Sequence, residues 1–131
     1  MKANGFPKAE HLCLKRYIDA LFTRPDGHAT AWPLRLVWQT ADEPPCQMLV
    51  SVAKRHLHHA VDRNRAKRQV REHYRLNKYL LHEGLTSPHH LHLAFIWMAD
   101  KPVESPRVEQ SVIRLLKACR AALDKSAAAQ E

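Results

Sequence analysis

The chain has 131 residues, of which 45% are hydrophobic, and its formal net charge is +8 at pH 7. This length and apolar content predict one domain with its own core and exclude a disordered basic tail. No apolar run reaches the roughly 20 residues of a membrane span, and the first residues lack a secretory signal. The three cysteines are widely spaced and include no Cys-x-x-Cys pair, so a disulfide framework is not expected. We therefore expect a cytoplasmic protein with no membrane partner. We expect a single domain over residues 1–131, with a frayed tail over 126–131.

The first half of the chain predicts one helix and at least two strands. Residues 9–23 place Ile18 on one apolar side at helical spacing, and a Pro-Asp-Gly turn follows them. Residues 34–39 alternate apolar and more polar side chains, as in a half-buried strand, and residues 46–53 form a second apolar run. Because a short polar loop joins these two strands, we expect them to pair antiparallel.

The next segment carries almost all of the excess charge. Residues 51–80 hold nine Lys or Arg and two Asp or Glu, so their net charge is 9 − 2 = +7. The spacing predicts a helix that begins between His58 and Arg63 and has one apolar and one cationic side. The apolar stripe consists of Ala66, Val70, Tyr74, Asn77 and Leu81. The cationic stripe consists of Asn64, Arg68, Arg71, Arg75 and Lys78.

The last third of the chain predicts a buried strand over residues 91–98 and a closing helix. Ser105 and Pro106 are typical of a helix start, as cap and first helical residue. The order of elements predicts an α+β fold in which helices cover one face of a small mixed sheet. A helix that links two parallel strands would by default make a right-handed crossover.

Three strings in the basic segment resemble the bacterial ribonuclease P protein component. They are Ser51-Val-Ala-Lys-Arg55, Ala60-Val-Asp-Arg-Asn-Arg-Ala-Lys-Arg68 and Arg71-Glu72. An Arg-Asn-Arg triplet alone would be weak evidence, but the ordered string at these spacings after a strand is specific. The resemblance implies a two-layer α/β sandwich with a mixed four-stranded sheet and three helices. It also implies a left-handed βαβ crossover, which replaces the right-handed default.

The same resemblance implies which residues contact RNA. Guanidinium and ammonium groups on a rigid helix suit a folded RNA, since arginine binds phosphate through two hydrogen bonds and stacks on bases. The positions that match the family's contacts to its catalytic RNA are Arg63, Asn64, Arg65, Lys67, Arg68 and Arg71, and Lys54 and Arg55 match the basic end of the preceding strand. With Arg75 of the cationic stripe, these residues form the expected RNA-binding set.

A second implied surface would bind the 5′ leader of precursor tRNA, in a cleft between the sheet and the first helix. Phe22 matches a family aromatic on that helix, whereas Ile18, next to Tyr17, stands where relatives often have another aromatic. Trp38 and Ser51 complete the leader-binding set on the predicted sheet. The implied activity is endonucleolytic maturation of tRNA 5′ ends, with catalysis by the RNA subunit and its Mg²⁺ ions. No side chain is expected to be catalytic, and no protein partner is required.

Two other functions remain open from the residues themselves. The basic helix would also serve a non-catalytic RNA-binding module, such as a ribosome-associated protein. The histidines could alternatively build a protein-only nuclease or metal-dependent hydrolase around His58, His59, His90 and His92. Against this reading, metal sites usually add Cys or carboxylate ligands, and no cysteine here has a matching spacing. We therefore expect no metal bound by the protein.

Overall fold

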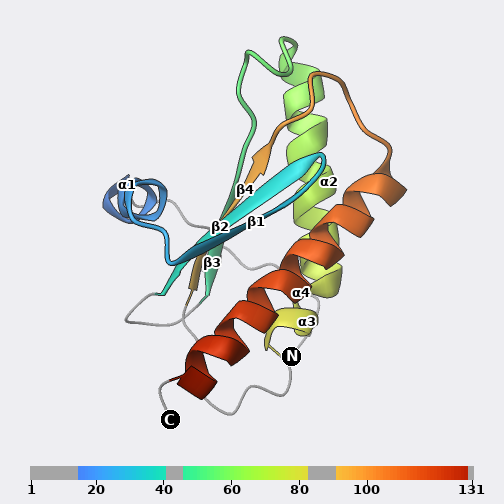
Figure 1. Ribbon diagram of the computed structural model, residues 1–131. Coiled ribbons are helices and arrows are strands. Elements are labelled where there is room, and N and C mark those ends of the chain that lie inside the picture. The colour runs from blue at the N-terminus through green and yellow to red at the C-terminus, as the bar shows by residue number, and fades with distance from the viewer. Residues whose placement is uncertain (1–14, 41–45, 83–90, 130–131) are drawn as a thin grey trace.

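The computed structural model describes residues 15–40, 46–82 and 91–129 (Figure 1). Small-residue and polar turns separate its elements, and the strands are richer in β-branched and aromatic residues than the helices. In chain order the elements are α1 (Lys15–Thr23), β1 (Gly27–Ala31), β2 (Leu34–Thr40), β3 (Gln47–Ser51), α2 (Ala60–Asn77), α3 (Tyr79–His82), β4 (Leu91–Trp97) and α4 (Ser105–Ala129).

The four strands form one mixed sheet in the order β1-β2-β4-β3. β1 pairs antiparallel with β2, β2 pairs antiparallel with β4, and β3 pairs parallel with β4. The predicted antiparallel pairing of residues 34–39 with 46–53 is therefore wrong, because β4 lies between those strands. β4 takes the central position since it is apolar on both faces, and all its residues except Ile96 are buried.

The helices lie on both faces of the sheet (Figure 1). Alternate residues of β2 and β4, such as Leu36 and Phe95, pack with α2 and α4 in the main core. The intervening residues, such as Val37 and Ala94, pack with Leu21 of α1 in a second, smaller cluster. The α+β class with a mixed four-stranded sheet is confirmed. The expectation that all helices cover one face is wrong, because α1 has its own apolar side and covers the opposite face.

The amphipathic pattern of α2 predicts its packing correctly. Its first residue, Ala60, falls within the predicted interval, and Ala66, Val70 and Tyr74 of the apolar stripe are buried. Leu81 is buried as well, but it belongs to the separate short helix α3. The helix thereby turns its cationic side away from the core.

Two further features place the functional surfaces. Gln69 of α2 donates its side-chain Nε2 to the carbonyl oxygen of Val103 (2.9 Å) and to Ser105 Oγ (3.1 Å), which ties α2 to the beginning of α4. At its other end α4 continues to Ala129, so residues 126–129 of the predicted frayed tail are helical. The alanines of this segment have the highest helix propensity of any residue, which explains the extension.

Candidate nucleic-acid interface

The outer side of α2 carries the densest charge of the described chain. Asn64, Arg65 and Arg68 are exposed, and Lys67 and Arg71 are half-buried along the same side of the helix. None of the four cations forms an ion pair with a carboxylate of the described ranges. A shallow hollow of about 420 Å³ is lined by Val61, Asn64, Lys67, Arg68 and Arg71. We call these five residues together with Arg65 the α2 cationic face.

Arg75 differs from the other cations of the stripe. Its Nη2 lies 2.5 Å from Glu72 Oε1, and its Nε donates to Glu72 Oε2 at 3.3 Å. The side-chain hydrogen bond from Arg75 lowers the pKa of Glu72, and the same bond raises the pKa of Arg75. Much of the Arg75 charge is thus neutralised within the helix. The contact of Arg75 with RNA stays a prediction. Because two of its nitrogens already bond to Glu72, Arg75 has fewer hydrogen-bond donors left for RNA than Arg68 or Arg71.

Arg63 also uses its side chain within the protein. Its Nη1 donates to the carbonyl oxygens of Leu57 and His58, both at 2.9 Å. These two carbonyls belong to the loop that leads from β3 into α2, and Leu57 is 3% exposed. Arg63 therefore holds the loop against the first turn of the helix. The sequence does not distinguish this structural role from RNA contact, because the residues around Arg63 in the chain are also basic.

Lys54 and Arg55 occupy an exposed turn in that loop, at the end of the molecule where α2 begins (Figure 1). The turn is held by a hydrogen bond from the amide of His56 to the carbonyl of Ala53 at 3.1 Å. The Nδ1 of His56 lies 2.7 Å from Asp100 Oδ1, in the loop after β4. Backbone and side-chain bonds thus place the two cations beside the first turn of α2, as the sequence predicts.

A second candidate surface lies on the sheet face that α1 covers. Ile18 packs with Val37 and Ala94 in the smaller cluster, whereas Phe22 is 44% exposed. Ser51 is half-buried, and the strand alternation places it on the same face as Leu49 of that cluster. Three of the four predicted leader-binding residues therefore share one face.

Trp38 does not lie on that face. Its side chain is 5% exposed and belongs to the main core between the sheet and α4. Leu34, Leu36 and Trp38 are alternate residues of β2, so all three side chains point to the same face of the sheet. Phe22 lies on α1, which covers the other face. The prediction that Trp38 and Phe22 line one cleft is therefore wrong, because the strand period of two puts Trp38 on the face that α4 covers.

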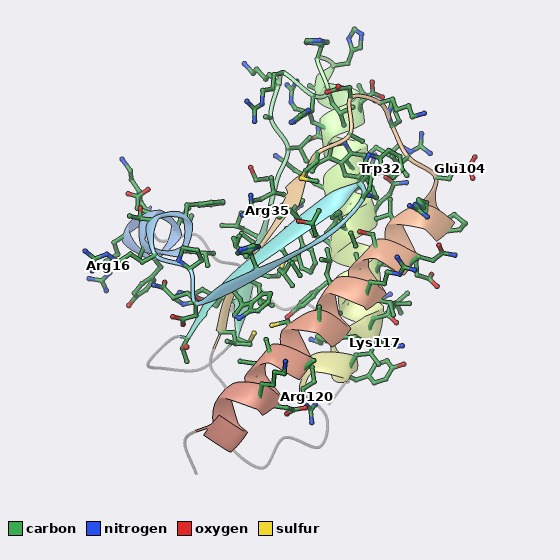
Figure 2. All side chains as sticks on the ribbon, in the orientation of Figure 1. Arg16, Trp32, Arg35, Glu104, Lys117 and Arg120 are labelled. Atoms are coloured by element: carbon green, nitrogen blue, oxygen red, sulfur yellow. The ribbon has the colours of Figure 1, made fainter. Side chains whose placement is uncertain are left out.

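Arg16, Tyr17 and Arg35, which are not among the predicted leader-binding residues, also belong to the α1 side. Arg35 is exposed and lies in register with Ile96, which in turn pairs with Ser51 (Figure 2). The ring of Tyr17 lies 4.9 Å from the ring of His92, and the guanidinium of Arg16 lies 4.8 Å from the Tyr17 ring. The sequence could have indicated that Arg35 is exposed, because Arg35 is the single polar residue among the apolar residues 34–38.

His58, His59 and His92 do not converge on one site in the described chain. His58 and His59 are exposed in the loop that follows the end of β3, whereas His92 is 6% exposed near the beginning of β4. Because β3 and β4 run parallel, these positions lie toward opposite ends of the sheet. His90 lies outside the described residues. Across residues 15–40, 46–82 and 91–129, no three His, Cys, Asp or Glu side chains are placed to hold a metal ion.

Fold and surface together define a small α+β domain whose crossover helix presents unpaired cations. A family model described as Ribonuclease P matches residues 6–123. The ribonuclease P protein component of Porphyromonas gingivalis is 38% identical over 117 residues, which cover 86% of this chain and 84% of that protein. The corresponding protein of Chlorobaculum tepidum is 32% identical over 109 residues, 75% of this chain and 70% of its own. The chain belongs to the ribonuclease P protein family.

Solved structures of ribonuclease P proteins share the fold. The protein of Staphylococcus aureus, 17% identical, superposes with a TM-score of 0.70 over 86% of this chain and 97% of that chain. The protein of Thermotoga maritima, 21% identical, gives a TM-score of 0.68 over 83% and 96%. The predicted family and its fold class are thus confirmed. Among the described helices, none is long and apolar enough to cross a membrane.

Proposed function

We propose that the chain is the protein subunit of ribonuclease P and that the α2 cationic face binds the catalytic RNA. The observation that carries the proposal is the set of unpaired cations on one side of α2. Arg65, Lys67, Arg68 and Arg71 have no ion pair in the described chain, so their donors are available to phosphate oxygens. Such a surface gains affinity from the release of counterions bound to RNA.

The α1 side of the sheet is the proposed site for the 5′ leader of precursor tRNA. Single-stranded RNA binds through bases stacked on aromatic rings and through cations that follow the backbone. Phe22 offers an exposed ring on α1, and Arg35 supplies an exposed cation on β2. Ile18 is half-buried beside them and offers an apolar contact where an aromatic ring would stack. Ser51 adds a hydroxyl on the neighbouring strand.

The chemical step is assigned to RNA. Mg²⁺ ions held by the RNA would activate the attacking water and stabilise the leaving oxygen. The protein's own residues would bind and orient the two RNAs. Their positive charge would offset the phosphate repulsion that otherwise requires more Mg²⁺ when the RNAs assemble.

Reconstitution with a bacterial ribonuclease P RNA at low Mg²⁺ tests the proposal. We expect the protein to stimulate cleavage of precursor tRNA at the 5′ end of the mature sequence, while the protein alone cleaves nothing. Binding of the RNA without any stimulation would instead favour a non-catalytic RNA-binding module. Hydrolysis by protein alone, lost on His58→Ala or His59→Ala, would contradict the assignment of catalysis to RNA.

A further inference from the structure

The tip of the β1–β2 hairpin exposes a tryptophan beside an arginine. Trp32 is 44% exposed, whereas Trp38 and Trp97 are 5% and 0% exposed. The Cζ of Arg107, in the first turn of α4, lies 5.5 Å from the centre of the Trp32 ring. Figure 2 shows Trp32 between the hairpin and the beginning of α4. The indole therefore combines a large apolar surface with an adjacent planar cation outside the main core.

The positive charge continues along the solvent side of α4. Arg107, Arg114 and Lys117 are all exposed, and their spacings of seven and three residues place them on one side of the helix. None of them forms an ion pair with a carboxylate in the described part of the chain. At 1.5 Å per residue this row extends about 15 Å along α4 from Arg107 to Lys117, long enough for a short run of single-stranded backbone.

The beginning of α4 connects this surface to α2. Gln69 of α2 binds the carbonyl of Val103 and the hydroxyl of Ser105, so the start of α4 lies against α2. Arg65, exposed on α2, lies one helical turn before Gln69. Arg107 follows Ser105 by two residues. On α4, Glu109 approaches His73 of α2 (3.4 Å), whereas the hydroxyl of Ser111 donates to the carbonyl oxygen of Ala31 in β1, so Arg107 and Trp32 lie on the side of α4 that faces the hairpin. An RNA that binds both surfaces must therefore extend across the beginning of α4.

We propose that Trp32, Arg107 and Arg114 form a second contact with the RNA subunit, which we call the hairpin contact. An unpaired base of that RNA stacks on the free side of the Trp32 ring, and the guanidiniums of Arg107 and Arg114 bind the flanking phosphates. The inference rests on the proposed function, because the RNA bound by α2 is the occupant. The chemistry favours RNA over a protein surface, since one aromatic ring among unpaired cations offers little apolar area.

Tryptophan fluorescence tests the hairpin contact directly in the intact protein. Trp32 is the exposed tryptophan, so collisional quenching by acrylamide reports mainly on its ring. We expect the RNA subunit to quench the emission and to protect it from acrylamide, and Trp32→Phe to remove both signals. Precursor tRNA alone should leave them nearly unchanged. A signal that came from precursor tRNA and not from the RNA subunit would overturn the assignment of the occupant.

Affinity measurements supply a second readout. Loss of one stacked base costs roughly ten-fold in affinity, so Trp32→Ala and Arg107→Ala should each raise the Kd for the RNA subunit by about that factor. Lys125→Ala is the matched control, because it removes an exposed cation from the far end of α4. It should change the Kd by about two-fold or less. Removing the nearby negative charge with Glu104→Gln should leave binding equal or tighter.

The outcomes separate this inference from the proposed function. If the protein stimulates precursor-tRNA cleavage but the Trp32 emission and the Trp32→Ala affinity do not respond to the RNA subunit, the hairpin contact is refuted and the proposed function stands. If the wild-type protein does not bind the RNA subunit at all, both fail. Circular dichroism of each variant identifies any loss of affinity that comes from unfolding, and the wild-type quenching experiment needs no variant.

Discussion

Adjacent residues of the basic segment have different surroundings, which a sequence pattern does not reveal. Arg63 donates to two loop carbonyls, whereas its neighbour Asn64 is exposed on the α2 cationic face. Charge and spacing predict RNA contact for both, because they report which side of a helix a residue occupies and nothing about its hydrogen bonds. The same is true of Trp38: the sequence does not show whether an aromatic residue on a strand packs in the core or lines a binding face.

The contrast between Arg63 and Asn64 gives a prediction. Arg63→Ala leaves the carbonyls of Leu57 and His58 without their donor, so we expect the free energy of unfolding to fall by about 1 to 2 kcal/mol. Asn64→Ala should leave stability within about 0.5 kcal/mol and weaken RNA binding. Urea unfolding and RNA titration of both variants check this. Equal stability of the two variants would show that the Arg63 hydrogen bonds contribute little.

His92 predicts a pH dependence of stability. Burial against the α1 side of the sheet lowers the pKa of His92 below its ordinary value of 6.5. As the pH falls below about 6.5, His92 takes up a proton in the unfolded chain before it does so in the folded protein, so this residue lowers stability progressively until its folded pKa is reached. His92→Gln should flatten that part of the curve, measured by urea unfolding between pH 5 and 7.5. An identical slope in both proteins would contradict the assignment.

At the scale of elements, local patterns predicted the helices better than the order of the strands. The start of the basic helix, the strand from Leu91 and the helix from Ser105 follow from period, caps and apolar runs, whereas the stripe that runs on to Leu81 missed the end of α2 at Asn77. β1 was not identified, because Gly27–Ala31 contains only small or polar residues and has no apolar alternation. The pairing of β3 with β4 joins segments that are distant in the chain, and no local signal encodes such a choice.

The central position of β4 makes its side chains the most sensitive in the sheet. Leu93 is 0% exposed and pairs with Trp38 on one side and Met48 on the other. Leu93→Ala should therefore lower the free energy of unfolding by about 2 to 5 kcal/mol, from lost apolar burial and the cavity it leaves. Leu76→Ala, at a position 37% exposed on α2, should cost less than about 1 kcal/mol. Comparable losses in urea unfolding would argue against a central β4.

At the scale of the molecule, the proposed RNA-binding residues fall into two separate regions of the surface. The α2 cationic face and the hairpin contact lie on the side of the sheet that α2 and α4 cover, whereas Phe22 and Arg35 lie on the α1 side. The sheet thus separates the surface proposed for the RNA subunit from the surface proposed for the leader. In the proposed complex, a mixed sheet with helices on both faces would let one small domain contact two RNAs at once.

The salt dependence of binding to the ribonuclease P RNA tests the central claim, that the α2 cationic face binds the catalytic RNA, most directly. Each phosphate contact adds a little under one unit to the slope of log Kd against log salt concentration. Arg65→Ala and Arg68→Ala alter exposed residues, so each should weaken binding and reduce the slope by about one while the fold is retained. Lys125→Ala, at the far end of α4, serves as the charge-matched control. A slope that falls only in the two α2 variants supports the claim, and an unchanged slope in both would contradict it.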